Sequence, residues 1–247
     1  MFWDPYCTIS GWHGVTSVVI GNCGFGFAPV KTQDRDRAML TMSRNEAVPL
    51  ESMRAGMPWD WETYPEFLDS LERTPKGVNL LSYVPLNPLM MYVMGLDAAK
   101  SRPASTAEMR EMKSLLTKAL GAGACGWSAQ LGGDNDIQRD YDGSSMITNT
   151  MAEADLVSFC HVLRDAGSGT IQCMGAGKRL TELMARESGR PIIWNVLALF
   201  ADQHGVAMPL YKDTLSWLED ANAGGLRVFG QALTCENNFQ FTFEDWN

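Results

Sequence analysis

One cysteine of this sequence stands where a catalytic or metal-binding group is commonly found. Cys23 lies between glycines in "GNCGFG", directly after "VTSVVI", a β-branched run that predicts a short, fully buried strand. A thiolate at the C-terminal end of a buried strand can ligate zinc or act as a nucleophile. Most free cysteines, however, pack as small apolar side chains, and composition alone favours that role. Taken by themselves, the residues leave both roles open for Cys23.

The histidines offer few further ligands, since the chain has only three. His13 precedes the first predicted strand, at the end opposite to the usual site of catalysis, so we expect a structural role. His161 lies beside Cys160 in an amphipathic helical segment, where packing or surface exposure is expected. His204 falls in a polar loop.

An acidic loop follows the third predicted strand. Four aspartates stand within a stretch of nine residues in this loop, and the favoured interpretation is a solvated acidic loop. Alternatively, some of the aspartates order Arg139 or line a pocket for a cationic group. The loop resembles a calcium-binding loop, but Ser145 stands where the closing glutamate of an EF-hand is required. The four residues are Asp134, Asp136, Asp140 and Asp142.

Composition and charge narrow the class of protein. The 247 residues are 45% hydrophobic and 20% charged, which predicts a single globular domain. A net charge of −9 argues against nucleic acid or an anionic membrane surface as the partner, and no apolar run approaches the roughly 18 residues of a membrane span. The six cysteines form no CxxC pair, and the opening residues do not read as a signal peptide, so we expect reduced thiols and a cytoplasmic protein.

The predicted strands alternate with helices, and no hairpin signal interrupts them. This order predicts parallel βαβ units, in either a doubly wound sheet or a (β/α)8 barrel. The loops 21–63, 130–150 and 231–247 are much longer than the turns that lead from helix to strand, which fits a barrel whose functional face lies at the C-terminal strand ends. Most of 31–63 is expected to be irregular. The predicted strands are "VTSVVI", "GVNLLSYVPL", "ACGWSAQ", "GTIQCM", "PIIWNVLAL" and "LRVFGQAL".

Capping residues support two of the predicted helices. Ser105 and Glu108 form a capping box before the helical segment that ends at Gly121, and Thr150 and Glu153 offer a second box for the next helical segment.

A longer stretch around Cys23 resembles a known family. "GWHGVTSVVIGNCGFGFAPV" is similar to the segment around the second barrel strand of the D-aminoacylase or N-acyl-D-amino-acid deacylase branch of the amidohydrolase superfamily, and "PWDWETYPEFLDSLE", "MMYVMG", "GACGWSAQ" and "GRPIIWN" follow in the family's order. The resemblance implies a metal-dependent (β/α)8 barrel in which zinc activates a water molecule that hydrolyses an amide. It also implies that Cys23 is a metal ligand, placed at the barrel mouth by its flanking glycines.

The same resemblance implies that 1–247 forms one incomplete barrel domain, approximately strands two to seven. The strand with the HxH ligand pair, the last strand with the proton-transfer aspartate and the surrounding β-sandwich have no counterpart in this sequence. Better-known D-aminoacylases carry metal-binding histidines at the ends of strands five and six, where this sequence has Gln172 or Cys173 and Asn195. Glutamine and asparagine are poor zinc ligands, whereas Cys173 is an adequate candidate.

These implications lead to a functional hypothesis. We expect a fragment of a zinc-dependent amidohydrolase that acts on a small-molecule linear amide, an N-acyl-D-amino acid, and that is inactive alone. The open edges of an incomplete barrel predict self-association. Two alternatives are a cyclic amidohydrolase of the hydantoinase type and a non-catalytic protein that reuses barrel elements for binding or assembly.

Overall fold

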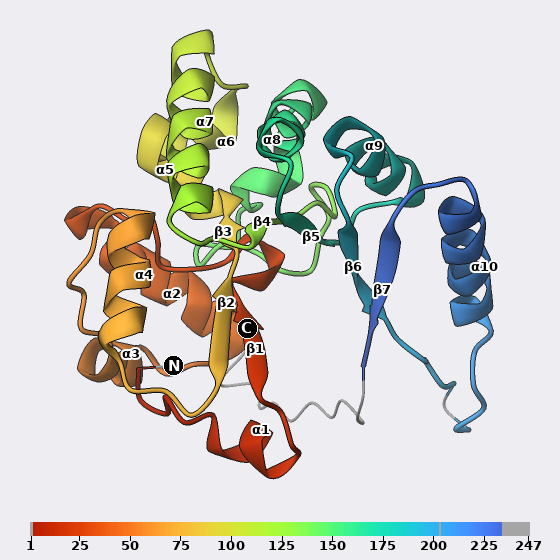
Figure 1. Ribbon diagram of the computed structural model, residues 1–247, viewed down its shortest axis with the longest axis horizontal. Helices are drawn as coiled ribbons and strands as arrows, with labels where there is room; N and C mark the ends of the chain where they lie inside the picture. The colour runs from red at the N-terminus through yellow and green to blue at the C-terminus, as the bar shows by residue number, and fades with distance from the viewer. Residues whose placement is uncertain (1, 203, 234–247) are drawn as a thin grey trace.

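The computed structural model describes residues 2–202 and 204–233, so Cys235 and most of the predicted loop 231–247 lie outside the described residues. Within this part of the chain, parallel strands alternate with helices (Figure 1). The strands are β1 (Ser17–Ile20), β2 (Asn79–Ser82), β3 (Val84–Pro85), β4 (Gly126–Gln130), β5 (Thr170–Met174), β6 (Ile192–Leu197) and β7 (Val228–Ala232). The α-helices are α1 (Thr8–Trp12), α2 (Arg35–Glu46), α3 (Leu50–Gly56), α4 (Tyr64–Arg73), α5 (Leu86–Met94), α6 (Leu96–Ser101), α7 (Thr106–Gly121), α8 (Glu153–Ala166), α9 (Lys178–Ser188) and α10 (Leu210–Ala223).

The strands pair in sequence order. β1 pairs with β2, and β3 to β7 form a second sheet in the order β3-β4-β5-β6-β7, with every named pair parallel. Only Tyr83 separates β2 from β3, and its N–H donates to the carbonyl of Ile20, so β2 and β3 act as one bent strand. The described residues therefore form six successive strand positions, with β1 and β7 at the two ends. All six predicted strands are found, and the predicted partial (β/α)8 barrel agrees with this arrangement.

Helices cover the outer side of the strands. Figure 1 shows α4 beside β2, α5 to α8 above the middle strands, and α9 and α10 beside β6 and β7. Their inward faces are apolar: α7, for example, buries Met112, Leu116 and Ala119. The core that results lies between β3–β6 and these helices, where Trp127 and Phe159 are fully buried.

Local signals account for several helix boundaries but not for all. The predicted box at α7 is present, because Glu108 N–H donates to the Ser105 hydroxyl and Ser105 N–H donates to the Glu108 carboxylate. The predicted box at Thr150 is wrong. α8 begins at Glu153 after Ala152, which offers no side-chain cap, and Thr150 belongs to the preceding 3₁₀ turn Ile147–Thr150.

Two further sequence expectations need correction. The segment 31–63, expected to be irregular, contains α2 and α3, whose polar sequences hide the helical period because few of their side chains reach the core. β1, expected to be fully buried, exposes alternate residues, with Val19 41% exposed, because no described segment covers the face of the β1–β2 pair on which Val19 and its partner Leu81 lie. In the described part of the chain, no helix is both long and apolar enough to span a membrane.

Candidate functional site

Cys23 sits in a tight turn at the C-terminal end of β1. Asn22–Gly24 form a single 3₁₀ turn in which Cys23 has a left-handed backbone (φ 57°). The flanking glycines allow the turn to lie against neighbouring strands: a Cβ on Gly21 would stand 2.8 Å from the Tyr83 carbonyl oxygen, and a Cβ on Gly24 would stand 3.0 Å from Ala129 Cα. The glycines are therefore needed at this place for close approach as well as for their backbone conformation.

Polar side chains from three other elements hold this turn. Gln172 on β5 accepts a hydrogen bond from the Cys23 N–H at 2.6 Å. Ser128 on β4 accepts from the Gly24 N–H at 3.0 Å and donates to the Gly21 carbonyl. Asn87 on α5 donates to the Gly24 carbonyl at 3.0 Å and accepts from the Thr148 N–H. Because Gln172 and Ser128 are fully buried, these bonds fix the turn without competition from water.

The thiol of Cys23 faces β5 and β6. Its Sγ lies 3.6 Å from Sδ of Met174 and 3.7 Å from Nδ2 of Asn195. Burial raises the pKa of this thiol to about 11, against a smaller lowering by the Asn195 hydrogen bond, and the charge of Glu46 raises it further. The thiol is therefore protonated at neutral pH unless a cation binds to it.

Two buried amides at the site lack part of their hydrogen bonding. Nε2 of Gln172 and Oε1 of Gln130 are buried and have no hydrogen-bond partner among the described residues.

The side chains of Gln172 and Met174 lie on the same face of β5, and this face is the one that contacts Cys23.

The second candidate cysteine lies elsewhere. Cys173 occupies the opposite face of β5, is fully buried in the core, and hydrogen-bonds to Thr181 on α9. Burial raises the pKa of its thiol to about 12. Of the positions where histidine ligands were expected, Gln172 and Asn195 adjoin Cys23, and Cys173 does not.

The aspartates of the acidic loop differ in their surroundings. Asp140 is 4% exposed and binds Arg37, Lys100 and Thr41, so the solvated interpretation is wrong for this residue. Burial acts to raise the pKa of Asp140, but hydrogen bonds from Lys100 and Thr41 and the charge of Arg37 outweigh it and hold the pKa below its ordinary value. This cluster ties the loop to α2 and α6.

The loop aspartates were alternatively expected to order Arg139, and Asp134 contacts Arg139 only through the Ser145 hydroxyl. Arg139 donates to the Ser145 hydroxyl, and that hydroxyl in turn bonds to Asp134. Asp142 is 43% exposed in its side chain and lies at the edge of the Arg37 cluster.

The histidines stay outside the site. His161 pairs with Glu187 at 2.8 Å on the helical surface, and His13 is exposed at the end of α1. Across residues 2–202 and 204–233, no three histidine, cysteine, aspartate or glutamate residues are grouped closely enough to hold a metal ion.

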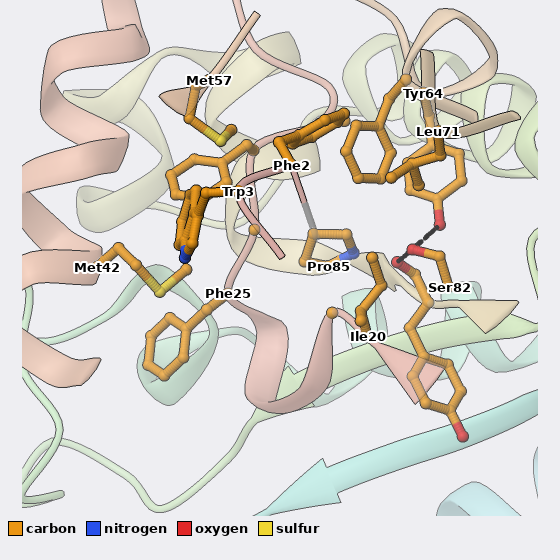
Figure 2. A pocket seen from close by; sticks show the side chains of 16 residues that line it. Phe2, Trp3, Ile20, Phe25, Met42, Met57, Tyr64, Leu71, Ser82 and Pro85 are labelled. Carbon is orange, nitrogen blue, oxygen red and sulfur yellow. Dashed lines mark hydrogen bonds between the residues drawn. The ribbon is translucent and has the colours of Figure 1, made fainter. Parts of the chain in front are cut away.

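An apolar cavity of about 210 Å³ lies behind the turn, between the β1–β2 pair and the layer of α2, α3 and α4. Gly21, Phe25 and Gly26, on either side of Asn22–Gly24, belong to its wall. Figure 2 shows Met42, Trp3 and Phe25 on one side of the cavity and Tyr64 and Leu71 on the other.

Comparison with known proteins places these features in a family context. No family model matches the chain. An uncharacterized protein of Mycobacterium tuberculosis is 32% identical over 154 residues, 60% of this chain and 24% of that protein. A D-aminoacylase of Alcaligenes xylosoxydans xylosoxydans is 32% identical over 116 residues, 47% of this chain and 21% of the enzyme.

The solved structures agree with the sequence relatives. The N-acyl-D-glutamate deacylase from Bordetella bronchiseptica, solved with zinc and a phosphonate inhibitor, matches with a TM-score of 0.63 and 17% identity over 92% of this chain and 43% of that chain. The chain is thus similar in sequence to a D-aminoacylase, and its fold is similar to those of a D-aminoacylase and an N-acyl-D-glutamate deacylase. The predicted resemblance is thus confirmed, and so is the fold expected from it. The chain spans about a fifth to a quarter of the length of the curated proteins it matches and less than half of the solved chains.

Some residues of the site were not identified from the sequence. Ser128, Asn87 and Met174 were not put forward, although the period of two along β4 and β5 places Ser128, Gln172 and Met174 on the faces of their strands that meet the Cys23 turn. Asn87 had no such signal, because its helix was not predicted.

Proposed function

We propose that this chain contributes six strand positions to the barrel of a metal-dependent amidohydrolase that hydrolyses N-acyl-D-amino acids. The observation that carries the proposal is the turn at the C-terminal end of β1, whose backbone is held by side chains from β4, β5 and α5 so that it presents the Cys23 thiol. The proteins similar to this chain also support the proposal, since they include a D-aminoacylase and an N-acyl-D-glutamate deacylase. We treat residues 1–247 as a single incomplete barrel domain and, because its six cysteines form no CxxC pair, as cytoplasmic.

The described residues do not by themselves make a zinc site. A catalytic zinc takes three protein ligands, normally thiolate, imidazole or carboxylate. Next to the Cys23 thiol stand a thioether and an amide, which are poor zinc ligands. We therefore assign Cys23 as one ligand and Gln172, Ser128 and Asn87 as the residues that hold it. Cys173 is less suited, because it faces the core.

The incomplete donor set makes the purified chain a direct test of the metal assignment. We expect weak zinc binding and no hydrolysis of N-acyl-D-amino acids by 1–247 alone. Zinc binding, measured by calorimetry, should be lost in Cys23→Ser and kept in Cys160→Ser, a buried cysteine on α8 away from the site. Zinc-dependent deacylation by the isolated chain, or equal loss of zinc binding in both variants, would contradict the assignment.

The activity itself is tested in the natural gene. We would sequence the DNA on both sides of this reading frame and express the extended product if the frame continues. The expected result is deacylation of N-acyl-D-amino acids that a chelator abolishes and that Cys23→Ser lowers by at least about 100-fold. Preferential cleavage of ring amides would favour a cyclic amidohydrolase instead.

The open strand edges favour a second candidate function, in binding or assembly. β1 and β7 each pair on one side only within the described residues. If unrelated sequence flanks the frame and the chain co-purifies with a stoichiometric partner from its native host, the hydrolase proposal must be given up for this one.

A further inference from the structure

The cavity behind the Cys23 turn has the properties of a site for a hydrocarbon chain. No charged residue lines it, and most of its wall is aromatic, aliphatic or thioether side chain. The buried hydroxyls at its edge are already used: the Tyr64 hydroxyl is hydrogen-bonded to the Ser82 hydroxyl and to the Tyr83 carbonyl, both at 2.8 Å (Figure 2). Polar groups make up only a small part of this wall, so burial of apolar surface is the main available driving force.

The size of the cavity sets a length for its occupant. Engineered apolar cavities of about 150 Å³ stay dry and bind benzene. A cavity of about 210 Å³ therefore holds a chain of about eight carbon atoms at similar packing. Trp3, 55% exposed, stands in the wall and marks where the cavity meets solvent.

The cavity lies against the turn that carries Cys23. Gly21, Phe25 and Gly26 form part of its wall, and the first two directly flank the turn that carries Cys23. Phe25 also packs in the small apolar cluster that includes Cys23. A ligand chain in this cavity therefore lies against the same turn that holds the thiol.

We propose that this cavity binds the acyl chain of an N-acyl amino acid and selects medium-length chains of about eight carbons over acetyl. The inference rests on the proposed function for the nature of the head group, whereas the binding of the chain rests on the cavity alone. Each methylene buried up to the length of the cavity should tighten binding about fourfold, after which affinity should level off.

The test is a binding series that does not depend on catalysis. N-acyl-D-alanines from acetyl to dodecanoyl are titrated into the full chain below their micelle concentrations, with calorimetry as the readout. The chain length at which affinity levels off should shorten in Met42→Trp, which fills the cavity, and lengthen in Leu71→Ala, which enlarges it. Met91→Trp, on a half-buried methionine of α5 outside this cavity, is the matched control and should leave that length unchanged.

Met42→Trp and Leu71→Ala should shift the chain length at which affinity levels off in opposite directions. A simple loss of stability in both variants would not produce opposite shifts. Circular dichroism verifies that each variant is folded. An affinity independent of chain length, or a levelling-off length that is the same in the wild type and both variants, overturns the inference. Length-dependent binding without amide hydrolysis by the extended gene product would refute the proposed function and leave the cavity assignment standing. Amide hydrolysis with no preference for chain length would support the proposed function and refute the cavity assignment.

Discussion

β4 and β1 are parallel strands of the same barrel, yet their surroundings differ. β4 pairs on both sides and is buried at all five positions, with Trp127 fully enclosed. β1 pairs on one side, and Val19 is 41% exposed opposite Leu81, which is 48% exposed. The β-branched sequence of β1 looks more like a buried strand than "GWSAQ" does. Burial here follows the number of neighbouring strands and helices rather than the residue types of the strand.

The same contrast applies at the other end of the described strands. β7 pairs only with β6, and Phe229 on it is 51% exposed. Large apolar side chains are also exposed in the segments next to these strands, including Trp12 before β1 and Phe200 after β6. Exposed apolar strand edges favour association with other chains.

The largest expected effect separates the central strand from the end strand. Trp127→Ala should lower the free energy of unfolding by about 3–5 kcal/mol, because it leaves a cavity in the core. Val19→Ala should cost less than about 1 kcal/mol, because its side chain is already partly in water. Urea unfolding followed by circular dichroism measures both. Similar losses in the two variants would show that β1 is covered in solution.

A smaller effect is expected for the ion cluster that joins the two regions, since Asp140 follows β4 and Arg37 lies on the helix after β1. Asp140→Asn should cost about 2 kcal/mol at pH 7, between the values typical of buried and surface pairs. The pKa of Asp140 is lowered in the folded chain, so its contribution is full above the ordinary carboxyl pKa near 4 and is lost as the pH falls through the folded pKa.

Urea unfolding at several pH values checks this sign. The difference between wild type and Asp140→Asn should shrink below about pH 4. Asp69→Asn, an exposed carboxylate on α4, is the control and should change little. A difference that grows on acidification would mean that Asp140 is not ionised in its cluster.

The smallest change in the free energy of unfolding is expected for substitutions in the end strands β1 and β7. These substitutions also test directly whether the strand edges cause association. We expect wild-type chain to self-associate, as measured by analytical ultracentrifugation over a range of concentrations. Val19→Lys and Phe229→Lys should each weaken association while changing the free energy of unfolding by less than about 1 kcal/mol, because exposed edge lysines disfavour strand pairing. Ile137→Lys, a more exposed apolar position in the loop after β4, is the control. A monodisperse wild-type monomer would contradict the prediction.

Much of the barrel could be predicted, because each strand–helix unit carries its own local signal. The capping box at Ser105 and the apolar face of α7 locate one helix closely, and the apolar runs locate all six strand positions. α2 was missed because its sequence is polar, and it is held by ion pairs such as Arg37 with Asp140, from residues about a hundred positions apart. Such pairs leave no local pattern.

The candidate site shows the same division. The sequence by itself determined that a cysteine stands between glycines at the end of a strand, because the β-branched run and the turn residues are local features. Only the tertiary structure decided that Gln172, Ser128 and Asn87 clamp that turn, that Met174 and Asn195 face the thiol, and that Cys173 turns to the core. The physical reason is that these contacts depend on which strand ends meet and on which face each side chain takes. Both are set by the packing of strands far apart in the chain.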